Sequence, residues 1–265
     1  MTFSELGLFL QIYFSVVAFA LGTVFGSFLN CAAWRIAHHM SFVRGRSICP
    51  KCKHVLSAVD LIPIVSFFMT RGRCRYCGDK ISVRYPLTEL ILGTLTVLTF
   101  IHGGLTPLFI RDFAFICCLF CLSLVDLEIY EIPNGTLFIS LMAWVLYLPF
   151  SGYDLRQVLL RLLAGAVYLV GFLLLSLLMD RILKRDSLGG GDIKLMGVAG
   201  LYFGLVGTLF MMIMACITGL VVACIHNREK GKSLPIPFGP FLSVACVCML
   251  LAGEPLVNWY LGLLF

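Results

Sequence analysis

Charged residues are scarce in this sequence. Only 13% of its 265 residues are Asp, Glu, Lys or Arg, whereas 60% are hydrophobic and the mean hydropathy is +0.99. Soluble domains carry about a quarter charged residues and an apolar share near one half. The composition therefore excludes a soluble globular domain and predicts a protein whose solvent is the lipid bilayer.

A basic stretch is missing before the first apolar run, which is preceded by Glu5 instead. A cleavable secretory signal begins with positive charge and ends in small residues at the cleavage site. We therefore expect the first run to be a permanent membrane span. Apolar runs near the length of a spanning helix, about 17–25 residues or longer, occur near residues 7–33, 86–104, 107–125, 134–150, 158–180, 193–225 and 236–265.

Lysine and arginine are missing from the turns near residues 103–104 and 151–155. Ten of the 20 lie between Arg35 and Arg84, and six more flank the run 193–225, namely Arg181, Lys184, Arg185, Arg228, Lys230 and Lys232. Because basic residues accumulate on the cytoplasmic side of membrane proteins, these segments are expected to be cytoplasmic and the amino terminus outside.

This orientation constrains the run 193–225. Both of its flanks are basic, so its 33 residues must cross the membrane an even number of times. They are too short for two full crossings, and we expect a turn near residues 200–204. The sequence thus predicts an all-α polytopic membrane protein with about eight transmembrane helices.

The only sizeable polar segment, residues 35–85, contains two C-x-x-C pairs, which are formed by Cys49, Cys52, Cys74 and Cys77. This spacing is typical of a four-thiolate zinc site, and a small polar loop needs such a centre to hold its fold. Disulfides or unpaired thiols are the alternatives, and a reducing cytosol disfavours the former. Four thiolates leave no open position, so the Zn²⁺ would be structural and no catalytic metal is expected.

Acidic residues are scarcer than basic ones, and two of them stand at ends of apolar runs. Asp126 closes the run 107–125, and Asp192 follows three glycines and opens the run 193–225. Either could be an ordinary helix cap at a wet interface. The charge distribution, however, places both at the same membrane face, where acidic residues mark functional sites.

Two neighbouring carboxylates do not both ionise easily, so one is expected to hold a proton while the other is charged. The charged group can take a proton from water, which attacks a peptide carbonyl, while the protonated group donates to the leaving amine. Such a pair titrates as a unit, which leaves open which residue is the base. Lys194 either stabilises negative charge there or extends its ammonium to the interface.

Several separated motifs together resemble the bacterial type IV prepilin peptidases, membrane aspartyl proteases of the Gly-x-Gly-Asp class. They are FGSFLN at residues 25–30 with Arg35, the two cysteine pairs, RYPLTEL at 84–90, the stretch 126–134, GGGDIK at 189–194 and PFGP at 237–240. The resemblance implies that Asp126 and Asp192 are the catalytic pair. It also implies cleavage of type IV prepilins or pseudopilins after a leader glycine, at the cytoplasmic face of the cytoplasmic membrane of a bacterium.

Many relatives with the cysteine loop also methylate the new amino terminus with S-adenosylmethionine, so the resemblance implies a possible second activity. No glycine-rich fingerprint for this cofactor is visible, and its binding residues are unknown. Glu89, just inside the second apolar run, is either a contributor to that site or a hydrogen-bonding residue in helix packing. A peptidase without methylation is an alternative.

A transporter that uses the two aspartates as an ion relay is a second alternative, although relays usually lie near the membrane midplane. The net charge of +6 is expected to face anionic lipid headgroups rather than nucleic acid. We expect three regions: a first transmembrane helix at 1–34, a cytoplasmic cysteine-loop domain at 35–85 and a transmembrane peptidase domain at 86–265. Two smaller expectations concern helix packing, namely a close approach at Gly22 and Gly26 and an interhelical hydrogen bond from Asn30.

Overall fold

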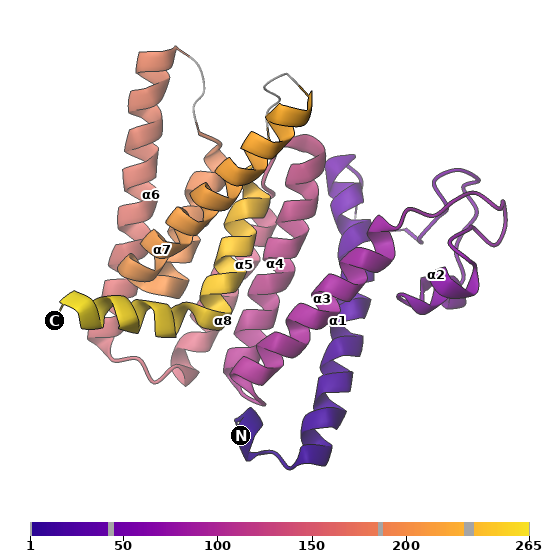
Figure 1. The fold of residues 1–265 in the computed structure, drawn as a ribbon, viewed down its shortest axis with the longest axis horizontal. Helices are drawn as coiled ribbons and strands as arrows, with labels where there is room; N and C mark the ends of the chain where they lie inside the picture. Colours follow the sequence, from indigo (N-terminus) through magenta and orange to yellow (C-terminus); the bar gives the residue numbers. More distant parts are fainter. Residues whose placement is uncertain (1, 42–44, 185–187, 231–235, 265) are drawn as a thin grey trace. The chain divides into compact units, whose positions relative to one another are not determined.

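The structure is a computed structural model that describes residues 2–41, 45–184, 188–230 and 236–264. Within these ranges the regular secondary structure consists of helices and two isolated β-bridges, joined by turns and loops (Figure 1). The α-helices are α1 (Leu8–Ala37), α2 (Val65–Met69), α3 (Arg84–Gly103), α4 (Pro107–Ile129), α5 (Asn134–Tyr147), α6 (Leu155–Leu183), α7 (Gly190–Lys230) and α8 (Gly239–Leu264). The short 3-10 helices are η1 (Phe3–Glu5), η2 (Ala58–Leu61) and η3 (Leu148–Phe150).

Six helices in the described ranges are long and apolar enough to cross a membrane: α1, α3, α4, α6, α7 and α8. The all-helical, multi-span character predicted from the sequence is confirmed, but the expected count of about eight spans is not. Two segments account for the difference. Helix α5 has only 14 residues, about 21 Å at 1.5 Å per residue, and the run 193–225 lies within a single long helix with one break.

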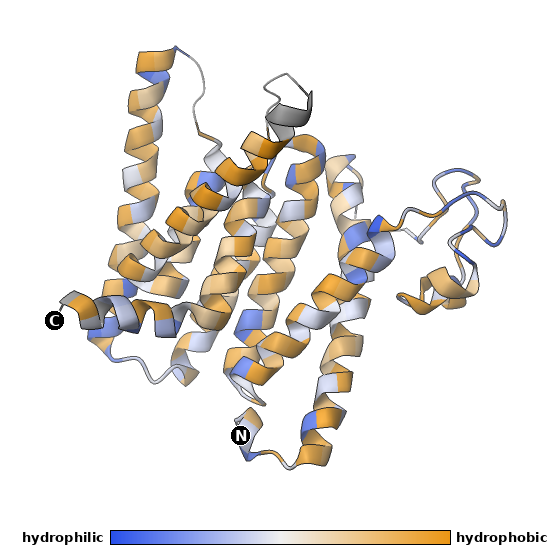
Figure 2. Cartoon of the chain, viewed as in Figure 1, coloured by the Kyte–Doolittle hydropathy of each residue, from blue (hydrophilic) through white to orange (hydrophobic). Residues whose placement is uncertain are grey.

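The chain divides into two compact units, an amino-terminal unit of residues 1–124 and a carboxy-terminal unit of residues 125–265. Hydrophobic residues predominate along the long helices, and hydrophilic residues are concentrated in the loop between α1 and α3 (Figure 2). The three-region division predicted from the sequence stays a prediction. Of the basic residues used to orient the chain, Arg44, Arg185 and Lys232 lie outside the described residues, and the side chains of Arg228 and Lys230 are not described.

In the amino-terminal unit, α1 packs closely against α3. A Cβ added at Gly22 would lie 2.8 Å from the Cα of Gly93, and one at Gly26 would lie 2.9 Å from the Cα of Glu89. The Asn30 side chain donates a 2.5 Å hydrogen bond to the Thr88 hydroxyl on α3. Both packing expectations are therefore confirmed, and small residues allow this approach where lipid offers no hydrophobic drive.

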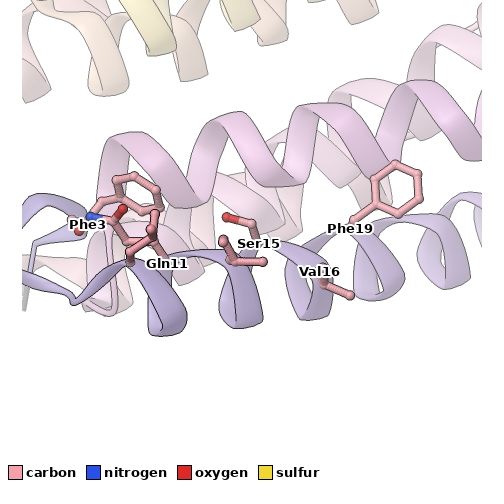
Figure 3. A pocket seen from close by; sticks show the side chains of 7 residues that line it. Phe3, Gln11, Ser15, Val16 and Phe19 are labelled. Carbon is pink, nitrogen blue, oxygen red and sulfur yellow. Dashed lines mark hydrogen bonds between the residues drawn. The ribbon is translucent and has the colours of Figure 1, made fainter.

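A shallow hollow of about 390 Å³ lies on the amino-terminal part of α1 (Figure 3). Its walls include Phe3, Val16 and Phe19, with Gln11 and Ser15 as the polar members. The Gln11 side-chain amide donates a 3.0 Å hydrogen bond to the Phe3 carbonyl. The lining contains no carboxylate or thiol, so the hollow offers no group for the chemistry considered below.

In the carboxy-terminal unit, α6 packs along α7, where a Cβ at Gly200 would lie 2.7 Å from the Gly165 backbone. Helix α7 is broken at Gly204, whose φ of 70° and ψ of −172° are suited to glycine alone. The break falls at the end of the 200–204 segment where the sequence predicts a turn. Side chains of α6 donate hydrogen bonds to backbone carbonyls at this break. Arg161 donates to the carbonyls of Leu201 and Tyr202, and the Tyr168 hydroxyl donates to the carbonyl of Leu205.

The two limbs of α7 on either side of Gly204 run in different directions (Figure 1). Near the break, Gly207 faces Met249 and Val257 of α8, whereas Gly219, farther along the second limb, faces Phe238 and Phe241 at the start of α8. The second limb therefore returns toward the start of α8.

Candidate functional site

Asp126 lies in the last turn of α4 and is only 5% exposed. One of its carboxylate oxygens, Oδ2, accepts a 2.9 Å hydrogen bond from the backbone N–H of Gly239, the first residue of α8. The amino-terminal end of a helix carries unpaired N–H groups and a partial positive charge, which favour a carboxylate. A Cβ at Gly239 would lie 2.7 Å from the same oxygen, so the contact requires glycine.

Asp192 lies in the first turn of α7, behind three glycines with different surroundings. A Cβ at Gly189 would lie 2.9 Å from Asp192 Oδ2, and one at Gly191 would lie 2.5 Å from the Cβ of Ile132. Gly190 has nothing within 4 Å of its added Cβ. The first and third glycines thus face close neighbours while the middle one faces open space, which gives a steric reason for a Gly-x-Gly-Asp pattern.

Two contacts join the start of α7 to the connection between α4 and α5. Gly191 lies against Ile132, and Lys194 Nζ donates a 2.7 Å hydrogen bond to Asn134 Oδ1. The connection begins with Tyr130 at a φ of 57°, and its N–H still bonds to the Asp126 carbonyl at 3.0 Å. The two sequence segments that carry Asp126 and Asp192 are therefore fixed against each other.

The two carboxyl groups are near enough for their charges to interact. They differ in hydrogen bonding, since Asp126 has the Gly239 N–H, whereas Asp192 Oδ1 is buried and has no hydrogen-bond partner among the described residues. A close pair with one oxygen left unpaired suits a shared proton or a bound water. The arrangement is chemically able to perform acid–base work.

The four cysteines singled out in the sequence come together in the amino-terminal unit. Their sulfur atoms all lie within 4.8 Å of one another. The two C-x-x-C segments have the same local fold: Lys53 N bonds to Cys49 O and Gly78 N bonds to Cys74 O, each at 2.9 Å. Lys53 and Gly78 both have positive φ, and each segment is closed by an antiparallel bridge, Ile48 with Val55 and Arg73 with Lys80.

This geometry fits a tetrahedral metal site. Sulfur atoms at the vertices of a zinc tetrahedron lie about 3.8 Å apart for a Zn–S bond of about 2.3 Å, and Cys49 Sγ and Cys77 Sγ are 4.0 Å apart. The backbone N–H of Cys52 lowers the pKa of the Cys49 thiol to about 7, which makes the thiolate accessible near neutral pH. The four-cysteine cluster could therefore bind a soft metal such as zinc.

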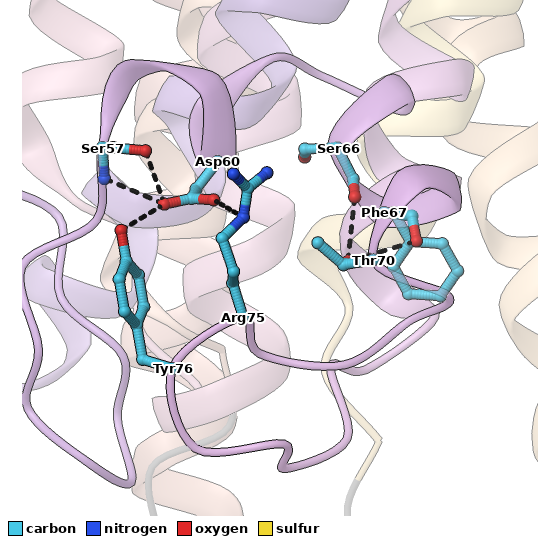
Figure 4. Close-up of polar contacts among 7 residues, drawn as sticks. All are labelled: Ser57, Asp60, Ser66, Phe67, Thr70, Arg75 and Tyr76. Atoms are coloured by element: carbon cyan, nitrogen blue, oxygen red, sulfur yellow. Dashed lines mark hydrogen bonds and ion pairs between the residues drawn. The ribbon is translucent and has the colours of Figure 1, made fainter.

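Asp60 connects the second cysteine segment to η2 (Figure 4). Its Oδ2 accepts hydrogen bonds from Ser57 Oγ at 2.6 Å, Ser57 N at 3.1 Å and the Tyr76 hydroxyl at 3.0 Å. Its Oδ1 lies 3.0 Å from Arg75 Nε. The hydrogen bonds from Ser57 lower the pKa of Asp60, with smaller contributions from Tyr76 and Arg75. A second ion pair, Lys51 with Asp79 at 2.7 Å, links the two cysteine segments at the surface and lowers the pKa of Asp79.

Glu89 lies in the second turn of α3 and is 6% exposed. Its Oε2 accepts a 2.7 Å hydrogen bond from the backbone N–H of Ile64, just before α2. This contact gives Glu89 the hydrogen-bonding role in packing, while a role in binding a methyl donor stays untested. The buried Arg35 has a related function at the other end of the cysteine loop, where it donates to the Arg46 carbonyl at 3.0 Å.

Some residues around the carboxylates were not identified from the sequence. The Gly239 N–H is a backbone group 113 positions from Asp126, and its only signal was the PFGP motif of the family resemblance. Asn134 belongs to the 126–134 motif of the family resemblance, but its contact with Lys194 belongs to neither of the two roles considered for that lysine. No sequence signal pointed to Asp60.

Six helices of spanning length, and two aspartates on segments that contact each other, define a multi-span membrane protein with a candidate acid–base site. Two family models match the chain. The bacterial peptidase A24 N-terminal domain matches residues 20–103, and the type IV leader peptidase family matches residues 113–224.

Several curated proteins are similar over nearly the whole chain. The prepilin leader peptidase/N-methyltransferase of Bacillus subtilis (strain 168) is 30% identical, with 92% of this chain and 97% of the relative covered. That of Myxococcus xanthus (strain DK1622) is 32% identical, with 89% and 70% covered, and that of Aeromonas salmonicida (strain A449) is 29% identical, with 95% and 94% covered. The chain belongs to the type IV leader peptidase family and is an enzyme of that family. No solved structure matches it.

Proposed function

We propose that this enzyme removes the leader peptides of type IV prepilins and pilin-like proteins, with Asp126 and Asp192 as the catalytic pair. The observation that carries the proposal is that the helix ends bearing these two carboxyl groups are held together in the carboxy-terminal unit, by Gly191 against Ile132 and by Lys194 with Asn134. The names of the relatives give the substrate class. A prepilin places a short leader next to an apolar helix, and an active site near the ends of spans meets that junction directly.

The two carboxyl groups differ in hydrogen bonding, and the proposed reaction uses one as a base and the other as an acid. One carboxylate takes a proton from water, the resulting hydroxide attacks the carbonyl carbon of the scissile bond, and the protonated partner donates to the leaving amine. The Gly239 N–H holds one oxygen of Asp126 at a fixed place. The second oxygen of Asp126 and the unpaired Oδ1 of Asp192 are then left to bind water and the substrate carbonyl.

The direct test is leader cleavage by the purified protein in lipid vesicles, with a prepilin as substrate and mass spectrometry of the product. Asp126→Asn and Asp192→Asn are each expected to lower the cleavage rate by about three orders of magnitude or more, as loss of a paired catalytic group does. Glu131→Gln is the matched control, because Glu131 is an exposed carboxylate on the α4–α5 connection. Normal cleavage by either aspartate variant would refute the assignment.

We propose further that Cys49, Cys52, Cys74 and Cys77 hold a structural Zn²⁺. When bound, the metal would supply a rigid link between the two cysteine segments and no reactive position. Metal analysis of the purified chain is expected to give one zinc per protein. Cys52→Ser is expected to lose it, while Cys31→Ser, outside the cluster, keeps it.

Methylation of the new amino terminus with S-adenosylmethionine is the second activity that we propose, and it is supported by the full name of the relatives. Incubation of enzyme, prepilin and S-adenosylmethionine is expected to give a mature product heavier by one methyl group, about 14 Da. A mature product without added mass would show that the enzyme cleaves the leader but does not methylate the new amino terminus. The residues that bind the methyl donor stay unassigned.

The cellular location is also a proposal, which combines the six spanning-length helices, the bacterial relatives and the basic loops. The enzyme would lie in the bacterial cytoplasmic membrane with its amino terminus outside and its carboxylates at the cytoplasmic face. Its partners are prepilin or pseudopilin substrates and the lipid bilayer, with no nucleic acid.

A further inference from the structure

The cysteine loop contains a group of exposed apolar side chains that its own fold leaves uncovered. Ile62, Val65, Phe68 and Met69, here called the apolar tip, are 43%, 50%, 71% and 65% exposed. They lie on and just before α2, which has only five residues. The neighbouring Phe67 behaves differently, because its ring packs against Gly72, where an added Cβ would lie 3.0 Å from the ring. The exposure is therefore specific to one side of this short helix.

Glu89 fixes the position of the apolar tip relative to α3. The Ile64 N–H bonds to the buried Glu89 carboxylate at 2.7 Å, and Ile64 has a φ of 61°, which is rare for a β-branched residue. Glu89 lies about 8 Å along the helix axis from Arg84, where α3 begins. Because α3 has 20 residues and is about 30 Å long, it just spans the hydrocarbon core. Its first turns, and the tip attached to them, thus lie at the membrane boundary.

The charges beside the tip complement an anionic surface. Arg71 and Arg73 follow α2 directly and are exposed, and no described acidic side chain pairs with them. The two acidic residues of the described loop, Asp60 and Asp79, are already paired with Arg75 and Lys51. Thr70, between the tip and these arginines, closes α2 by bonding to the Ser66 carbonyl at 2.9 Å (Figure 4).

We propose that the apolar tip is an interfacial anchor, which inserts into the lipid at the headgroup boundary while Arg71 and Arg73 bind anionic headgroups. Apolar side chains that enter this boundary beside basic residues gain both hydrophobic and electrostatic energy. The Glu89 contact sets the depth of insertion. The anchor holds the cysteine cluster at the membrane surface instead of leaving it free in the aqueous phase.

The experiment places a photo-crosslinking residue at the tip of the full-length protein. Phe68→p-benzoylphenylalanine, in vesicles of phosphatidylglycerol and phosphatidylethanolamine, is expected to give lipid adducts on irradiation. Val55→p-benzoylphenylalanine is the matched control, because Val55 is 40% exposed but lies beside Lys53 and His54 in the first cysteine segment. Lipid adducts are expected to be several-fold more abundant at position 68 than at position 55.

A second arm tests the headgroup charge. Exchange of the anionic vesicles for phosphatidylcholine, or the double substitution Arg71→Gln and Arg73→Gln, is expected to lower the adduct yield at position 68. Equal yields in all conditions would overturn the electrostatic part of the proposal. Adducts of position 68 with another part of the same chain, or with a second copy, would overturn the lipid as the occupant and identify a protein surface in its place.

Discussion

Glycine hydrogens, rather than side chains, determine how closely the backbone approaches the two carboxylates. At the residue scale, the three glycines before Asp192 offer a matched series. Gly191→Ala would place its Cβ 2.5 Å from Ile132, whereas Gly190→Ala meets nothing within 4 Å. A displacement of about 1 Å at a reacting group costs roughly a hundredfold in rate. We therefore expect a loss of that order for Gly191→Ala in the leader cleavage assay and near-normal cleavage for Gly190→Ala. The reverse order would show that the Ile132 contact does not position Asp192.

Gly239→Ala tests the partner aspartate in the same way. The substitution keeps the backbone N–H but places a Cβ 2.7 Å from Asp126 Oδ2, so the carboxylate must move. Because the substrate is not displaced directly, kcat is expected to fall about tenfold or more while KM stays the same. Gly219→Ala is the control, since its Cβ would make ordinary contacts of 3.5 Å or more. A change in KM alone would refute a positioning role.

Asp60 gives a prediction about pH. Its folded-state pKa is lowered by the Ser57 hydrogen bonds, so the stability it contributes is present above its unfolded-state pKa, about 3.9, and is lost as the pH falls through the folded value. Asp60→Asn is expected to cost about 1–3 kcal/mol of local stability at neutral pH, because Ser57, Tyr76 and Arg75 lose a charged acceptor whose side chain is only 8% exposed. Asp79→Asn, at an exposed and solvent-screened ion pair, should have a much smaller effect. Hydrogen exchange of residues 57–77 in each variant measures both values.

At the scale of elements, the break in α7 depends on α6. Arg161 reaches the Leu201 and Tyr202 carbonyls, which have lost their helical partners, and the Tyr153 ring lies 4.5 Å from its guanidinium. Arg161→Met keeps much of the apolar stem but leaves these carbonyls unpaired, which costs about 1–3 kcal/mol for each buried group. We expect a lower unfolding temperature than for Arg156→Met, a control on the exposed first turn of α6. Equal unfolding temperatures would mean that water replaces the guanidinium.

Reporter fusions test the whole molecule. Since the second limb of α7 returns toward the start of α8, fluorescent-protein fusions that end after Leu183 and after Ile225 are both expected to fluoresce, as they do only on the cytoplasmic side. Phosphatase fusions at the same two positions should both be inactive. Opposite results at the two sites would show that α7 crosses the membrane once, and would remove the charge-parity argument for its two limbs.

The sequence predicted best those structural features that depend on neighbouring residues or on the summed composition of a segment. Apolar runs predicted the long helices, spacing predicted the four-cysteine cluster, and charge parity predicted a turn close to Gly204. It overestimated the number of spans because run length alone does not show that α5 stops at 14 residues. It also missed the Gly239 and Asn134 contacts, because one is a backbone donor and the other depends on tertiary packing.

The short first limb of α7 has a consequence for the bilayer itself. Residues 190–203 form about 21 Å of helix, and the neighbouring α5 is equally short, so neither matches a hydrocarbon layer of about 30 Å. Neighbouring helices cover most of this limb, but α5 exposes Phe138, Ile139 and Leu146 to the bilayer. Lipids in contact with so short a helix are expected to thin the membrane locally. Headgroups and solvent are then drawn inward beside Asp192, where hydrolysis needs a supply of water that an undisturbed bilayer would withhold.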